Sequence, residues 1–107
     1  MSTTSSNPTP LLLRLIGGDP AATAEVLASA VTSEDPSVLV AAALLAGDPS
    51  YLERAGGHAF TVRDRQLVVL AKAQLSHQAD LFDALVRDHL AEHPDHLLAA
   101  WIAGRQP

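Results

Sequence analysis

The residues best suited to chemistry in this chain are three histidines near its C-terminal end, His89, His93 and His96. His89 and His93 are four positions apart, so on a helix both rings would lie on one face, as in H-x-x-x-H sites for Zn²⁺ or Ni²⁺. An oxygen ligand can come from three neighbouring carboxylates, Asp88, Glu92 and Asp95. One hypothesis for the function is therefore a small metal-binding or enzymatic helical protein that uses this cluster.

The same histidines also have a structural interpretation. His89 lies on the apolar face of its segment, where we expect a core histidine with one hydrogen-bonded nitrogen. His93 directly precedes Pro94, which ends a helix, so its ring is expected near the last helical carbonyls. His96 lies beyond that turn, on a different helix. We therefore expect no metal and no cofactor, and we keep the three histidines as candidate ligands.

No other pattern in the chain predicts catalysis. His58 and His77 lie in expected loops, without a Ser or Asp at a recognisable catalytic spacing. The glycine pairs at 17–18 and 56–57 match no phosphate-binding sequence and follow no strand. Four acidic residues near helix starts are expected to be N-caps: Asp19, Asp35, Asp48 and Asp80. We expect no catalytic residues and no enzymatic activity.

Composition excludes several further classes. The 107 residues carry a net charge of −5 with only seven Lys and Arg, which disfavours binding to nucleic acid or to an anionic membrane surface. No cysteine is present, so disulfides and thiolate chemistry are excluded. The longest apolar stretch, 38–46, is far shorter than the roughly 20 residues that span a bilayer. Because residues 1–10 contain no export signal, we expect a cytoplasmic protein.

Prolines and glycines divide the chain into short segments with helical patterning, and no segment alternates with period two over a useful length. A short apolar segment at 11–16 comes first. Expected helices then cover 20–32, 36–46 and 61–75, a short one carries Tyr51 and Leu52, one runs from Asp80 to Pro94, and a last one carries Leu97 and Trp101. We predict an all-α fold of about five or six helices, in a single domain at 11–104 after a disordered tail at 1–10.

Two segments of the chain resemble each other. P-S-V-L-V-A-A-A-L-L-A at 36–46 aligns with P-D-H-L-L-A-A-W-I-A-G at 94–104, each with a glutamate two positions before the proline. Each also follows an amphipathic segment. The pattern indicates a unit of a helix, a proline turn and a second helix rich in small residues, which is how paired-helix repeats stack.

Residues 35–104 extend this pattern, in the stretches A-L-L-A-G-D-P-S-Y-L-E-R-A, R-D-R-Q-L-V-V-L-A-K-A-Q-L and L-F-D-A-L-V-R-D-H-L-A-E-H-P-D-H-L-L-A-A. This part of the chain resembles tetratricopeptide-repeat helical hairpins, although the W-x-x-L-G-x-x-Y opening of that family is absent. The resemblance implies stacked antiparallel hairpins in a scaffold that binds peptides or partner proteins.

Three residues are candidates for a partner interface. Arg63 and Arg65 open an expected helix with alternating charges, typical of a solvated face or of partner-facing ion pairs. Trp101 either seals the end of the core or anchors an interface.

Our main hypothesis for the function is a non-catalytic protein-protein interaction module. Two hairpins leave an apolar face uncovered unless 11–16 caps it, so the module would self-associate as a homodimer or bind a protein partner. A helical subunit or regulator of a larger complex is a third possibility.

Overall fold

The computed structural model describes residues 9–104, and within that range the fold is all-α, with seven helices and no strand. The helices are α1 (Thr9–Ile16), α2 (Pro20–Ala30), α3 (Pro36–Ala46), α4 (Ser50–Gly57), α5 (Val62–Leu75), α6 (Ala79–Glu92) and α7 (Leu97–Ala103). The all-α prediction is confirmed, but the expected five or six helices were too few. The reason is that both short segments, α1 and α4, form complete helices of eight residues.

The first helix begins slightly before the expected domain boundary. α1 starts at Thr9, two residues earlier than residue 11, and has Pro10 in its first turn, where the missing N–H has no helical partner to lose. The rest of the predicted tail, 1–8, lies outside the described residues, as do 105–107.

Several helix ends form as the sequence predicts. The carboxylates of Asp19 and Asp35 accept hydrogen bonds from the backbone N–H groups two residues on, at 2.9 and 2.8 Å, and each is followed by the first-turn proline of its helix. Thr61 caps α5 through a bond of 3.0 Å from the N–H of Asp64. α3 ends at Gly47, whose φ of 66° is a left-handed conformation that glycine adopts without strain.

Two of the four predicted N-caps were wrong in detail. Asp48 accepts a hydrogen bond from the N–H of Ser50, but it lies one residue before the N-cap position, which Pro49 occupies. Asp80 lies within the first turn of α6, because that helix begins one residue earlier than predicted. A carboxylate in the first turn is still favourable there through the helix dipole.

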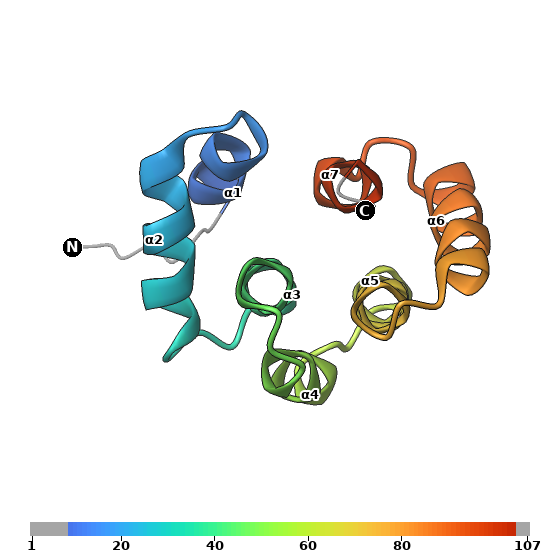
Figure 1. The fold of residues 1–107 in the computed structure, drawn as a ribbon, viewed down its shortest axis with the longest axis horizontal. Coiled ribbons are helices and arrows are strands. Elements are labelled where there is room, and N and C mark those ends of the chain that lie inside the picture. The colour runs from blue at the N-terminus through green and yellow to red at the C-terminus, as the bar shows by residue number, and fades with distance from the viewer. Residues whose placement is uncertain (1–8, 105–107) are drawn as a thin grey trace.

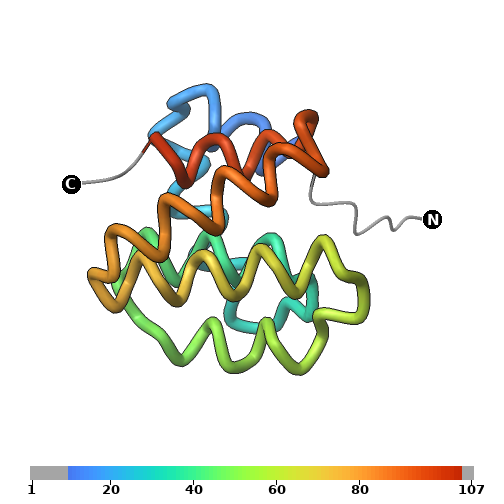
Figure 2. The backbone as a smooth tube through the Cα atoms, turned by 90° about the vertical axis from the view of Figure 1, so that its right-hand side faces the viewer, coloured from blue at the N-terminus to red at the C-terminus, as the bar shows by residue number. Residues whose placement is uncertain are grey.

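Each helix packs on the next one along the chain, and two further pairs give the fold its shape. α3 packs against α5, and α1 packs against α7, so the two ends of the described chain meet (Figure 1). Figure 2 shows that α5, α6 and α7 run in alternating directions. No helix within residues 9–104 is long and apolar enough to cross a membrane.

α3 is the central helix of the core. Seven consecutive residues, from Val38 to Leu44, are buried, so this helix is surrounded rather than packed along one stripe. The three alanines at 41–43 are fully buried, and their small side chains allow neighbouring helices to approach closely. The apolar run read from the sequence therefore marks a buried helix inside a small domain.

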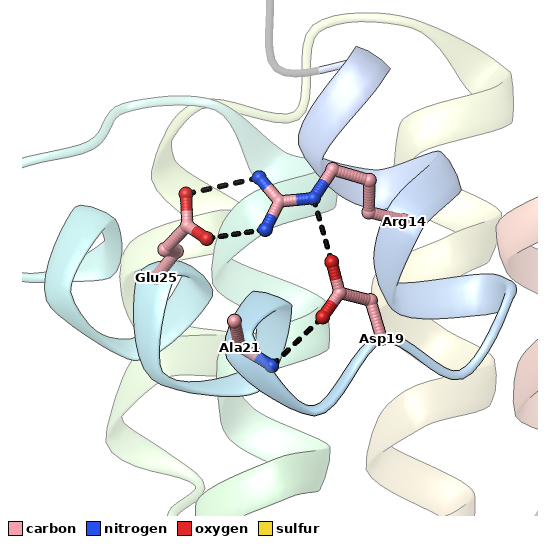
Figure 3. A network of polar contacts seen from close by, with 4 residues as sticks. All are labelled: Arg14, Asp19, Ala21 and Glu25. Atoms are coloured by element: carbon pink, nitrogen blue, oxygen red, sulfur yellow. Dashed lines mark hydrogen bonds and ion pairs between the residues drawn. The ribbon is translucent and has the colours of Figure 1, made fainter.

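An ion-pair network fixes α1 against α2 (Figure 3). Nε of Arg14 donates to Oδ2 of Asp19 at 2.9 Å, and the other guanidinium nitrogens donate to both carboxylate oxygens of Glu25. Arg14 lowers the pKa of the Asp19 carboxyl, and the bond from the N–H of Ala21 lowers it further. Because these groups are exposed, the network adds little to the stability of the fold.

The two similar segments differ in where their helices begin. α3 starts at Pro36 itself, whereas α7 starts at Leu97, three residues after Pro94. The residue before Pro36 is the capping Asp35, but His93 precedes Pro94, and the N-cap of α7, His96, makes no side-chain cap bond. The difference in capping residue shortens the second helix at its start.

The turn between α5 and α6 generates a prediction. His77 has a φ of 59°, a left-handed conformation that costs a residue with a Cβ about 1 kcal/mol or more. We expect His77→Gly to raise the free energy of unfolding by about 0.5–1 kcal/mol, measured by urea denaturation. His77→Ala keeps the Cβ and serves as the control, which should not gain stability. A glycine variant less stable than the alanine variant would contradict this interpretation.

Candidate functional site

A chain of hydrogen bonds joins α5, α6 and the start of α7 through two buried histidines. His89 and His96 are only 1% and 5% exposed, and Nε2 of His89 lies 2.7 Å from Nδ1 of His96. On its other side, Nδ1 of His89 lies 2.7 Å from Oε1 of Gln66. The amide nitrogen of Gln66 in turn donates to a carboxylate oxygen of Glu92 at 2.9 Å.

The chemistry of these groups determines the direction of the chain. An ionised carboxylate only accepts, so the amide of Gln66 donates to Glu92 and presents its oxygen to His89. His89 therefore carries its proton on Nδ1, and a neutral His89 accepts at Nε2. His96 must then donate from Nδ1, which leaves the lone pair of a neutral His96 on Nε2.

Burial keeps both imidazoles neutral. Desolvation, followed by the positive charge of Arg63 and the nearby histidines, lowers the pKa of His96 to about 4, against a small opposing effect of Asp95. Desolvation also lowers the pKa of His89, with contributions from His93 and Arg63, and Glu92 opposes this shift. A neutral pair is what the hydrogen-bond chain requires.

The three candidate histidine ligands come together in space without converging on one point. The ring of His89 contacts those of His93 and His96, with centroids 5.0 and 4.9 Å apart. Both nitrogens of His89 are already hydrogen-bonded, one more than the single bond expected for a core histidine. Within residues 9–104, no three His, Asp or Glu side chains are placed to hold a metal ion.

A cavity of about 240 Å³ lies next to His96, where α1, α7 and the starts of α3 and α5 meet. These four helices surround the middle of the molecule in Figure 1. Leucine and isoleucine side chains line its apolar side: Leu12, Leu13 and Ile16 from α1, and Leu97 and Leu98 from α7. The contact between the first and last helices therefore creates a partly apolar concavity.

The other side of this cavity is polar. It is lined by Ser37, Arg63, Asp64, Asp95 and His96. Arg63 forms no ion pair with a carboxylate of residues 9–104, although two aspartates line the same cavity. One of the predicted interface residues thus lies in a concave site beside the histidine chain.

Arg65 lies in a different place, a groove of about 360 Å³ between α5 and α6. Val62 and Val69 line this groove and are 57% and 48% exposed, and the half-buried Leu85 faces them from α6. Arg65 and Asp88 add charges of opposite sign. The groove has the apolar floor and polar rim that are common in protein interfaces.

Trp101, the third predicted interface residue, is half-buried and packs against the core from α7. The structure therefore does not bring the three predicted interface residues together: Arg63 lines the cavity, Arg65 lines the groove, and Trp101 contacts the core.

Sequence reasoning missed Gln66 and the cavity. Gln66 is 23 residues from His89 in the chain, and only the packing of α5 on α6 brings the two side chains together. The one signal for it is a polar side chain directly before the buried run that starts at Leu67.

Searches against models of protein families, curated proteins and solved structures found no match to this chain.

The buried histidines predict how stability depends on pH. Their pKa values are lowered in the folded state, so the unfolded chain takes up protons first, from pH about 6.5 downward. The stability is complete above that pH and is lost as the pH falls toward 4. Between pH 7 and 4.5 we expect urea denaturation to show a loss on the order of 2 kcal/mol.

A double variant separates the effect of the two histidines on acid stability from the effects of other titrating groups. Replacing both His89 and His96 with Leu should flatten this pH dependence, whereas His58→Gln, in the α4–α5 loop, should keep it. The lowered pKa values of Asp19 and Asp48 act at lower pH, below this window. An unchanged pH dependence in the double variant would contradict the assignment.

Gln66 provides a second test. Gln66→Ala leaves the N–H of the buried His89 without its acceptor, so we expect a loss of about 1–3 kcal/mol in the free energy of unfolding. Lys72→Ala, at an exposed position of the same helix, is the control and should change stability by less than about 0.5 kcal/mol. Equal effects of the two substitutions, measured by urea denaturation, would argue against a structural role for Gln66.

Proposed function

We propose that this chain is a non-catalytic protein-protein interaction module, built of hairpins like those of tetratricopeptide repeats, and that it acts in the cytoplasm. The observation that supports the proposal most directly is the groove between α5 and α6. Val62 and Val69 are about half exposed there, although the chain has enough buried side chains elsewhere to form its core. Exposed apolar side chains gathered in a groove are a common mark of a binding surface.

The occupant that suits this groove is an amphipathic helix of a partner protein. Two antiparallel helices form a shallow channel, into which a third helix can place a stripe of apolar side chains. The apolar floor formed by Val62, Val69 and Leu85 would take that stripe. Arg65 would pair with an acidic residue of the partner helix and Asp88 with a basic one, and the two pairs would fix the direction in which that helix lies.

The histidine chain is consistent with a non-catalytic role. Both nitrogens of His89 are used for internal hydrogen bonds, and a buried, neutral imidazole held in this way positions α6 against α5 and α7. The acidic charge of the chain and its few basic residues favour a protein partner over nucleic acid.

Selection from a display library of helical peptides against the full chain tests this proposal. We expect the selected peptides to carry apolar residues at helical spacing, and Val69→Asp to weaken their binding by about tenfold or more. Val31→Asp introduces the same charge at a 68% exposed valine after α2, far along the chain from the groove, and serves as the control. Peptides that bind both variants equally well would contradict the proposal.

Light scattering after gel filtration separates a partner helix from a second copy of the chain. The proposal expects a monomer at micromolar concentration, with the groove open. A homodimer that Val69→Asp converts to monomers would instead assign the groove to self-association and would overturn the proposed occupant.

A further inference from the structure

The cavity beside His96 holds charges of both signs that are not paired with each other. Arg63 lies on its lining together with Asp64 and Asp95, yet Arg63 forms no ion pair with either aspartate. A cation and two carboxylates therefore line one concavity, each available to a ligand of the opposite charge.

His96 adds a buried acceptor to the same lining. His96 is 5% exposed and donates a hydrogen bond from Nδ1 to His89, so the nitrogen that remains for a ligand is Nε2, which carries a lone pair. Glu92, through Gln66 and His89, sets this tautomer. A neutral imidazole acceptor with a fixed tautomer recognises a hydrogen-bond donor, and an ammonium group is the strongest donor of small size.

The opposite wall is apolar and sets what else the ligand carries. Leucine and isoleucine side chains of α1 and α7 form it, and they would pack against an aliphatic group. At about 30 Å³ per water-sized group, the volume of about 240 Å³ takes roughly eight non-hydrogen atoms. That is the size of a small aliphatic amino acid.

From this lining we infer that the cavity is a binding site for a free α-amino acid with an aliphatic side chain, such as valine. The α-carboxylate lies against the guanidinium of Arg63. The α-ammonium donates to Nε2 of His96 and to the carboxylate of the adjacent Asp95. The side chain packs against the leucines of α1 and α7. Because these leucines come from the first and last helices, the ligand stabilises the contact that closes the fold.

Calorimetric titration of the full chain with L-valine tests the site, and two analogues test its two charges. Isobutylamine lacks the carboxylate and 3-methylbutanoate lacks the ammonium. We expect valine to bind with a dissociation constant of about 1 mM or tighter, and each analogue to bind about tenfold or more weakly. No saturable heat with valine up to about 20 mM, or an analogue that binds as well as valine, would overturn the inference.

Two substitutions locate the binding to this cavity. Arg63→Gln and Asp95→Asn change exposed residues of the lining, so both variants should fold, and each should weaken valine binding by about tenfold or more. Arg87→Gln removes the same charge from an exposed position of α6 outside the lining and should leave the dissociation constant within about twofold. Equal effects of Arg63→Gln and Arg87→Gln would also overturn the site.

The groove between α5 and α6 takes no part in these titrations, so their outcome is independent of the proposed partner binding.

Discussion

The buried hydrogen bond between His89 and His96 is the interaction on which the contact between α1 and α7 depends. It joins the last turn of α6 to the residue before α7, and Gln66 extends it to α5. Since α7 begins directly after His96, this bond sets where the last helix lies. α7 can then meet α1, and the cavity between them follows from that contact. The directed hydrogen bond also fixes the tautomer that His96 presents.

Much of the helical layout can be predicted from local residue chemistry. Asp19 and Asp35 cap the helix starts where they were expected, because capping involves only residues a few positions apart. Asp80 was misplaced as a cap because helix starts shift by a residue or two without changing the pattern. The central place of α3 follows from its unbroken apolar run, but the contact of α1 with α7 does not follow from any local signal.

The candidate site was harder to predict because it depends on packing between distant segments. The histidines were recognised by their spacing, yet their partner Gln66 is on another helix. Arg63 and Arg65 were assigned to one interface, although they serve different concavities. Residues that are two positions apart on an α-helix lie about 200° apart around its axis, so Arg63 and Arg65 face opposite sides of α5. A resemblance to helical hairpins suggests binding surfaces but cannot say which residues line them.

The orientation of the histidine chain can be measured directly by long-range proton–nitrogen NMR of the imidazole rings at pH 7. Our account predicts that His89 and His96 are both neutral, that both carry the proton on Nδ1, and that a coupling across the hydrogen bond links Nε2 of His89 to Nδ1 of His96. A protonated His96, or a neutral His89 with its proton on Nε2, would contradict the account.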